Sequence, residues 1–244
     1  MKYQKLFVFF FAFIFTFILY STFKNNKIYY LSLGDNFAVG LTPFDEINKS
    51  YSDYFCDYLE NKNLLDKYNN YFSEINYKTT DLINDIKLNK EKEINDKKIS
   101  INESIAKSDI ITISIGFNDL FYSAKYNKEE CKINNKMKEN IDKIFKNIEE
   151  IISLIRKIND SDIYFIGYFN PHNEKDGITD SMIDYLENKF KTIDNKNIYY
   201  IDIKEGFKNK SYYLPNIKNP NPSLEGYNFI ANSIIKEFEQ NNKK

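Results

Sequence analysis

The sequence predicts an α/β domain of three layers, in which helices cover both faces of a parallel sheet. Five short runs rich in Ile, Tyr and Phe are separated by segments in which apolar residues recur at helical spacing. The runs are apolar throughout rather than alternating, which is typical of strands buried on both faces. With 244 residues, the chain is long enough for one such domain with a substantial core.

The chain begins with an apolar segment that precedes the predicted domain. Leu6–Phe23 is an uncharged run of 18 residues, which as a helix crosses a bilayer core of about 30 Å. Lysines flank the run on both sides, and the slight positive bias before it favours a cytoplasmic amino terminus. We therefore expect residues 1–26 to be a single-pass anchor in the cell membrane, with residues 27–244 on the extracytoplasmic side. A signal peptide cleaved near Ser21 is the alternative.

The first half of the domain is expected to alternate strands and helices. A strand stopped by Gly34 is followed by a helix that Ser50 caps, and a Thr cap starts a second helix. The expected elements are a strand over 27–35, a helix over 51–59, a strand over 68–77 and a helix over 79–88. The next segment, residues 89–98, is highly charged and is expected to be solvated.

The second half continues the same alternation. One long amphipathic helix is marked by Ile residues three or four apart, and this stripe is expected to face the core. The expected elements are a strand over 108–119, the long helix over 134–157, a strand over 161–169, a helix over 181–190, a strand over 197–203 and a helix over 224–238. Because ligands bind beyond the carboxyl ends of parallel strands, the loops after Leu33, Ile115 and Phe169 should share one rim where chemistry would occur.

Composition excludes some classes of partner and site. The net charge of -1 and the interspersed Lys and Asp/Glu argue against nucleic acid as a partner. One histidine, His172, and two distant cysteines cannot provide the ligand spacing of a zinc site, so we expect no metal and no cofactor. Cys56 and Cys131 would both lie outside the membrane, where a disulfide and two half-buried thiols are both compatible with the sequence.

Three short blocks, each at the end of an expected strand or before the last helix, carry a resemblance to a known family. They read "LGDNFAVG" (33–40), "SIGFNDL" (114–120) and "LPNIKNPNPSLEGYNFIA" (214–231). Over roughly residues 27–240, the chain resembles the SGNH or GDSL-type hydrolases, in particular membrane-tethered or lipoprotein acylhydrolases of bacteria. The resemblance implies a five-stranded, flavodoxin-like parallel sheet.

The resemblance also places the family's catalytic triad, and the triad residues are replaced. Asn36 stands where the family has its nucleophilic serine, and Asn221 where it has the histidine that takes the serine's proton. Lys218 stands where the aspartate would be, or Asn219 if the register shifts by one residue. An amide is a very poor nucleophile and does not shuttle protons near neutral pH. The triad is therefore degenerate.

Other positions of the family's site are present in the sequence. The resemblance implies an oxyanion-hole-like set of donors from Asn36, Asn118 and the backbone of Tyr77, which stands at or near the usual glycine. The supporting positions are expected at Gly34, Asp35, Gly116 and Asp119. The two aspartates are expected to bond loop backbone rather than a cation.

Two functions of different classes remain open at this point. The first is a pseudoenzyme that binds an acyl, acetylated or carbohydrate ligand or a protein partner; a rim closed by Tyr77 would favour a scaffold. The second is an active esterase with a non-standard nucleophile. His172 could serve it as a base, although a solvent-exposed loop histidine is the plainer interpretation. A pair of Lys218 with Ser32 or Ser223 has only proximity to support it.

Overall fold

The computed structural model describes residues 27–122, 133–171, 177–193 and 196–242. Within them, five parallel strands form one sheet in the order β2-β1-β5-β6-β7. The strands are β1 (Ile28–Gly34), β2 (Leu65–Asn69), β5 (Ile110–Ser114), β6 (Asp162–Ile166) and β7 (Ile198–Ile201). This is the strand order of flavodoxin-like sheets, so the predicted fold class is confirmed.

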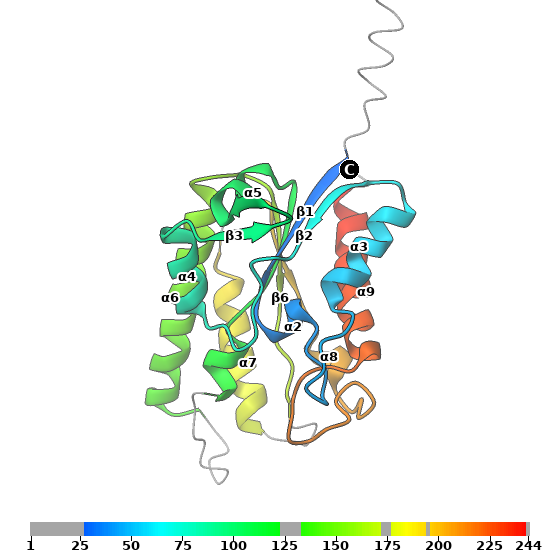
Figure 1. Cartoon of the computed structure of the whole chain (residues 1–244). Coiled ribbons are helices and arrows are strands. Elements are labelled where there is room, and N and C mark those ends of the chain that lie inside the picture. Colours follow the sequence, from blue (N-terminus) through cyan, green and yellow to red (C-terminus); the bar gives the residue numbers. More distant parts are fainter. Residues whose placement is uncertain (1–26, 123–132, 172–176, 194–195, 243–244) are drawn as a thin grey trace, which may run out of the picture.

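Helices cover both faces of the sheet (Figure 1). On one face, α3 (Tyr51–Asn61) packs against α9 (Leu224–Asn241), and on the other α6 (Asn135–Arg156) packs between α4 (Thr79–Lys87) and α7 (Gly177–Phe190). Shorter elements complete the described chain: α2 (Asn36–Val39), α5 (Ile101–Lys107), the π-turn η1 (Asn118–Tyr122) and α8 (Lys204–Phe207). The three predicted layers are therefore present.

Local sequence explains where the main helices begin. The Ser50 side chain accepts a hydrogen bond from Asp53 N (3.1 Å), and the Asp53 carboxylate accepts one from Ser50 N (2.8 Å), which is a capping box. Asn134 caps α6 through Met137 N at 3.0 Å. The apolar stripe of α6 is buried as predicted, at Ile141, Ile144, Phe145, Ile148, Ile151, Ile152 and Ile155.

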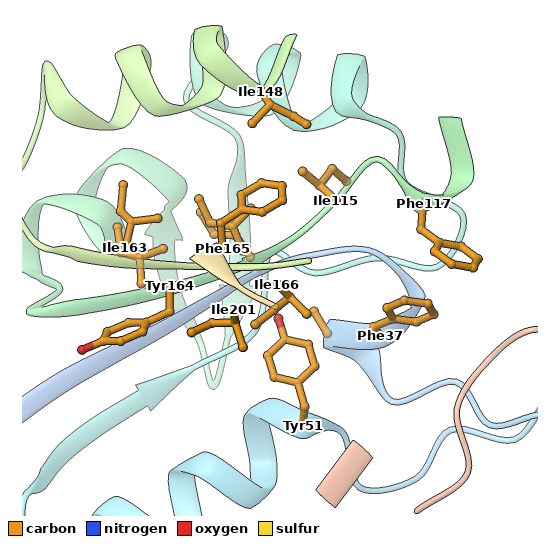
Figure 2. Close-up of a cluster of buried hydrophobic side chains, with 14 of the residues drawn as sticks. Phe37, Tyr51, Ile115, Phe117, Ile148, Ile163, Tyr164, Phe165, Ile166 and Ile201 are labelled. Atoms are coloured by element: carbon orange, nitrogen blue, oxygen red, sulfur yellow. The ribbon is translucent and has the colours of Figure 1, made fainter. Parts of the chain in front are cut away.

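The core lies between the sheet and the two helical layers. Every residue of β5 is buried, and the strands contribute Ile163, Tyr164, Phe165 and Ile166 from β6. Figure 2 shows these side chains together with Ile148 from α6 above the sheet and Tyr51 from α3 below it. Burial on both faces explains why the strand sequences are apolar without alternation.

Two predicted segments differ from the structure. The strand predicted over 68–77 is wrong in its extent, because β2 ends at Asn69, whose side chain accepts a hydrogen bond from Tyr71 N (3.0 Å) and turns the chain. The charged segment 89–98 contains a hairpin, β3 (Glu91–Ile94) and β4 (Lys97–Ser100), on residues expected only to be solvated. Its two turn residues have positive φ angles of 50° and 59°, as type I′ turns require.

The start of α4 also differs by one residue. Lys78, not a threonine, occupies the cap position, and Thr79 is the first residue of the helix. The backbone N–H of Thr79 donates a hydrogen bond to the carboxylate of Asp119, which lies on another loop, and not to a local capping side chain. A tertiary contact therefore replaces the predicted local one.

The predicted membrane anchor, Leu6–Phe23, lies outside the described residues. Among the helices of the described part of the chain, none combines the length and the apolar character that crossing a bilayer requires.

Candidate functional site

The turn after β1 brings the first block to the carboxyl edge of the sheet. Gly34 has φ 150°, and a Cβ there would lie 2.1 Å from the backbone oxygen of Ser114, so the two strands approach more closely than a side chain allows. Asp35 N donates to the same oxygen at 2.9 Å. The Asp35 carboxylate then caps α2 by accepting from Phe37 N (3.2 Å), and it also accepts from Ser114 Oγ (2.7 Å). These bonds fix the position of Asn36.

Asn36 occupies the nucleophile position and is 3 % exposed. Its side chain is bonded at both ends. Oδ1 accepts from Asn76 N at 2.6 Å, and Nδ2 donates to Oδ1 of Asn221 at 3.4 Å. The structure therefore brings together the two triad positions, Asn36 and Asn221, that lie 185 residues apart in the sequence.

Asn219, not Lys218, contacts Asn221. Asn221 Nδ2 donates to Asn219 Oδ1 at 2.7 Å, whereas the Lys218 side chain is exposed at the surface. Asn219 Nδ2 in turn donates to the Asp45 carboxylate at 2.8 Å. Of the two candidate acid positions, Asn219 is therefore the one whose side chain bonds to Asn221.

The three asparagines form a chain of hydrogen bonds with one direction. Each amide nitrogen donates to the next amide oxygen, from Asn36 through Asn221 to Asn219, and the last donates to Asp45. We call these three side chains the amide chain. Bonds of this kind polarise one another and end here on a carboxylate. None of the three amides ionises near neutral pH, so the chain holds the loops together without moving protons.

The oxyanion position contains an asparagine that is bonded within the protein. Asn118 is 2 % exposed, and its Nδ2 donates to the carbonyl oxygen of Tyr77 at 2.8 Å. The backbone N–H of Tyr77 donates to Glu74 O at 3.4 Å. An oxyanion hole needs donors directed at the developing charge. At least one hydrogen of Asn118 and the N–H of Tyr77 are directed at protein carbonyls.

The Tyr77 side chain does not fill the rim. Its hydroxyl bonds to Asp85 Oδ2 and accepts from Lys90 Nζ at 2.6 Å, and Lys90 also pairs with Glu74 at 2.9 Å. Burial, opposed by the Lys90 hydrogen bond, raises the pKa of Tyr77. This cluster anchors the loop before α4.

Aromatic rings pack against one another at positions that follow Asn36 and precede Asn118 in the sequence. Phe37 lies 4.7 Å from Phe117 and 5.5 Å from Phe169, measured between ring centroids, and Figure 2 shows Phe37 and Phe117 side by side at the end of the sheet. The crevice that Phe37 and Phe117 line with Tyr168 has no space for a water molecule. Asn36 does not line this crevice, and its own side chain is buried.

The remaining supporting positions bond the second block to neighbouring loops. Asp119 accepts from Thr79 N (3.0 Å) and Thr79 Oγ1 (2.8 Å), and burial raises the pKa of its carboxyl group. Gly116 has φ 99°, a conformation open to glycine, and a Cβ there would lie 2.7 Å from the Tyr168 hydroxyl. That hydroxyl donates to Ile115 O at 2.8 Å. Both aspartates of the site thus bond loop groups.

The other candidate residues do not assemble into a second site among the described residues. Ser223 caps α9 and donates to Tyr212 O at 2.8 Å, and Ser32 is buried within β1. Neither has a bond to the exposed Lys218. Cys56 is half-buried on α3, and burial raises its pKa to about 12, which makes it an unreactive thiol. His172 and Cys131 lie outside the described residues.

Two partners of the amide chain were not predicted from the sequence. Asn76 and Asp45 bond to Asn36 and Asn219 across 40 and 174 residues of sequence, respectively. Asn76 directly precedes Tyr77, which the family resemblance had already placed at the site, so the sequence indicated Asn76 only weakly. Asp45 had none. In the part of the chain that the structure describes, no group of three or more His, Cys, Asp or Glu side chains could hold a metal ion.

Comparison with known proteins agrees with this geometry. The model of the GDSL-like lipase/acylhydrolase family matches residues 24–234. None of the curated proteins gives a significant match.

Several solved structures are similar in fold. A lipase from a goat rumen metagenome aligns with a TM-score of 0.67 at 21% identity, covering 85% of this chain and 95% of the lipase. An acetyl xylan esterase from Geobacillus stearothermophilus aligns with a TM-score of 0.59 at 18% identity, covering 85% and 93%. A family 3 carbohydrate esterase from Clostridium thermocellum aligns with a TM-score of 0.54 at 15% identity, covering 86% of this chain and 94% of the esterase. At these identities the likeness concerns the fold.

Proposed function

The chain belongs to the family of GDSL-like lipases and acylhydrolases, and we propose that it is a catalytically inactive member that acts by binding. The observation that carries this proposal is the amide chain. A hydrolase of this kind needs a hydroxyl nucleophile, a base beside it and a carboxylate that orients the base. Here Asn36, Asn221 and Asn219 occupy those places and are bonded to one another.

The amides differ from a triad in what they can do with a proton. A serine attacks an ester only when a neighbouring group takes its proton, and imidazole does this because it titrates near neutral pH. The Asn36 amide has no hydroxyl to activate, and its Nδ2 already donates to Asn221. No acyl-enzyme intermediate forms at this position in the proposed function.

Because the triad positions are buried, we propose that the protein binds its partner through its surface and not at these positions. Asn36 and Asn221 are 3 % and 2 % exposed. In contrast, Phe44, Ile47 and Ile217 are 68 %, 65 % and 71 % exposed on two loops at the same edge of the sheet. Neighbouring exposed apolar side chains of this size are typical of interaction sites. We propose that a protein partner is bound through these loops.

A small ligand is the second form of this binding role. The similar solved structures include a lipase, an acetyl xylan esterase and a carbohydrate esterase. Lipid esters and acylated carbohydrates are therefore the first compounds to test for binding. Such a ligand would have to displace Phe37 or Phe117 from the closed crevice, because that crevice has no space for a water molecule.

The proposed location is the outer face of the cell membrane. Leu6–Phe23 is long and apolar enough to span a bilayer as a helix, and it ends four residues before Lys27, where the described domain begins. The domain would then be held close to the membrane surface. Protease accessibility of the domain in intact cells tests this orientation: an inaccessible domain would contradict it.

Activity measurements test the proposal directly. The full chain in mild detergent should give no turnover of p-nitrophenyl acetate or butyrate above the buffer rate. It should also remain unlabelled by a fluorophosphonate probe, which reacts with activated serine hydroxyls. A rate that disappears in Asn118→Ala, or one probe-labelled residue identified by mass spectrometry, would instead establish an esterase with a different nucleophile.

A further inference from the structure

Asp35 is a buried carboxyl group that the amide chain does not use. It is 1 % exposed, at the point where β1 ends and α2 begins. On the adjoining face of the sheet, the neighbouring strands carry Ser32, Thr112 and Ser114, which are also buried. A continuous polar stripe therefore crosses the core behind the turn that holds Asn36.

The two oxygens of the Asp35 carboxyl group have different surroundings. Oδ1 accepts from Ser114 Oγ and Phe37 N. Oδ2 is buried and has no hydrogen-bond partner in the described part of the chain. The hydroxyls of Ser32 and Tyr51 are buried as well; they form no hydrogen bond of good geometry, but Ser32 lies close enough to Tyr51 to oppose the rise in the pKa of Tyr51 that burial causes. An unpaired oxygen on a buried carboxylate is costly, because the ion loses its hydration and gains nothing in return.

No positive charge compensates Asp35. Within the described residues, Asp35 forms no ion pair. The ionisable groups that interact electrostatically with its carboxyl group are all acidic: Asp119 on η1, Tyr51 on α3, Tyr168 after β6 and Tyr227 on α9. Burial raises the pKa of Asp35 to about 7, and the nearby Asp119 acts in the same direction. The hydrogen bonds from Ser114 and Phe37 oppose this shift but are outweighed.

We propose that Asp35 is a proton-binding site, and that folding takes up one proton here at mildly acidic pH. The bound proton neutralises the carboxyl group, so the buried oxygen Oδ2 no longer carries an uncompensated charge. Loss of the proton leaves a buried anion at the junction of β1 and α2. The stability of the turn that holds Asn36 is therefore coupled to the external pH.

The sign of the coupling follows from the two states. In the unfolded chain, an aspartate ionises near pH 3.8, whereas folded Asp35 keeps its proton to about pH 7. Between these values the folded state binds the extra proton, so stability falls as the pH rises through this window. The expected fall in the folding equilibrium constant from Asp35 alone is about a hundredfold to a thousandfold across the window.

Asp35→Asn tests the proposal, because an amide has nearly the same shape as a carboxyl group and is neutral at every pH of the experiment. The full chain in detergent is unfolded in urea between pH 4.5 and 8. Relative to the parent, the midpoint of Asp35→Asn should rise as the pH increases to about 7 and then level off. Asp66→Asn, an exposed aspartate on β2, is the matched control and should show no such trend.

A second measurement on the parent keeps the test independent of the variant's folding. Infrared spectra of the parent at pH 6 should show the carbonyl band of a protonated carboxyl group, and the band should disappear as the pH passes through about 8. If the parent lacks this band, or if Asp35→Asn and Asp66→Asn respond to pH alike, Asp35 is ionised throughout and the proposal is wrong.

Discussion

Two sets of buried polar side chains meet at the carboxyl ends of β1 and β5, and their bonds differ in kind. Asp35 and Asp119 use carboxylates to hold backbone N–H groups and hydroxyls of neighbouring loops. The amide chain, Asn36, Asn221 and Asn219, bonds mainly to itself and to Asp45. The first set matches the family's supporting positions, and the second stands where its triad would be.

The comparison indicates which features the fold needs and which the chemistry needs. The carboxyl groups of Asp35 and Asp119 satisfy donors that would otherwise be buried unpaired, so they have a structural role whether or not the protein is an enzyme. Triad residues serve a reaction, and their places can be taken by groups that preserve hydrogen bonding between loops but do not titrate. In the proposed function, the amide chain is such a replacement. Four predictions test this division, in order of expected effect.

Removal of a supporting carboxylate should have the largest effect. Asp119→Ala deprives Thr79 of two hydrogen-bond acceptors and leaves its backbone N–H unpaired at the start of α4. We expect a loss of about 3 kcal/mol in the free energy of unfolding, since bonds to charged groups contribute about 1.5 kcal/mol each. Urea unfolding followed by circular dichroism measures it, with Asp66→Ala as the exposed control. Equal losses of unfolding free energy in both variants would contradict a structural role for Asp119.

A charge introduced into the amide chain should have the next largest effect. Asn36→Asp keeps the shape of the side chain but places a second acceptor against Asn221 Oδ1, in a buried position. We expect a loss of about 2 kcal/mol, because an acceptor then faces an acceptor and a charge is buried. Asn36→Ser, which removes the amide without adding charge, should cost about half as much. If Asn36→Asp is the more stable of the two in urea, the assigned direction of the amide chain is wrong.

Reconstruction of the triad should produce a modest activity that depends on register. Asn36→Ser, Asn219→Asp and Asn221→His together place a carboxylate on the residue that contacts position 221. Turnover of p-nitrophenyl acetate should exceed that of the parent by about tenfold, which corresponds to about 1.4 kcal/mol of barrier. Each single change should have no effect, because triad residues act as a unit.

The matched control for this experiment carries Lys218→Asp instead of Asn219→Asp. Because Lys218 is exposed and does not contact Asn221, this triple variant should remain at the parent's rate. Adding Asn118→Ala should abolish any activity gained. Higher activity with Lys218→Asp than with Asn219→Asp would show that the loop rearranges and that the family's usual spacing applies.

The smallest expected effects are on stability, and they distinguish Asn219 from Lys218, the two candidates for the acid position. Asn219→Ala removes bonds to Asn221 and Asp45 and should cost about 1 kcal/mol. Lys218→Ala removes an exposed side chain and should change stability by less than about 0.5 kcal/mol. Thermal unfolding of the two variants side by side provides the comparison. A larger loss for Lys218→Ala would contradict the contacts described for Asn219.

The sequence by itself determined the fold class and the main helices. The apolar strands and the caps at Ser50 and Asn134 act over a few residues, so their pattern is visible locally. The first two blocks placed Asn36 and Asn118 correctly after strand ends, because each of these blocks follows directly from a strand.

Tertiary structure alone decided which side chains meet. Asn219 rather than Lys218 contacts Asn221, Asp45 ends the amide chain, and the Tyr77 ring faces Lys90 instead of the rim. These contacts join loops that are far apart in the sequence, where a shift of one residue moves a side chain from the interior to the surface. Burial is likewise a property of the assembled layers: the unpaired oxygen of Asp35 exists only because α2, α3 and β5 close around it.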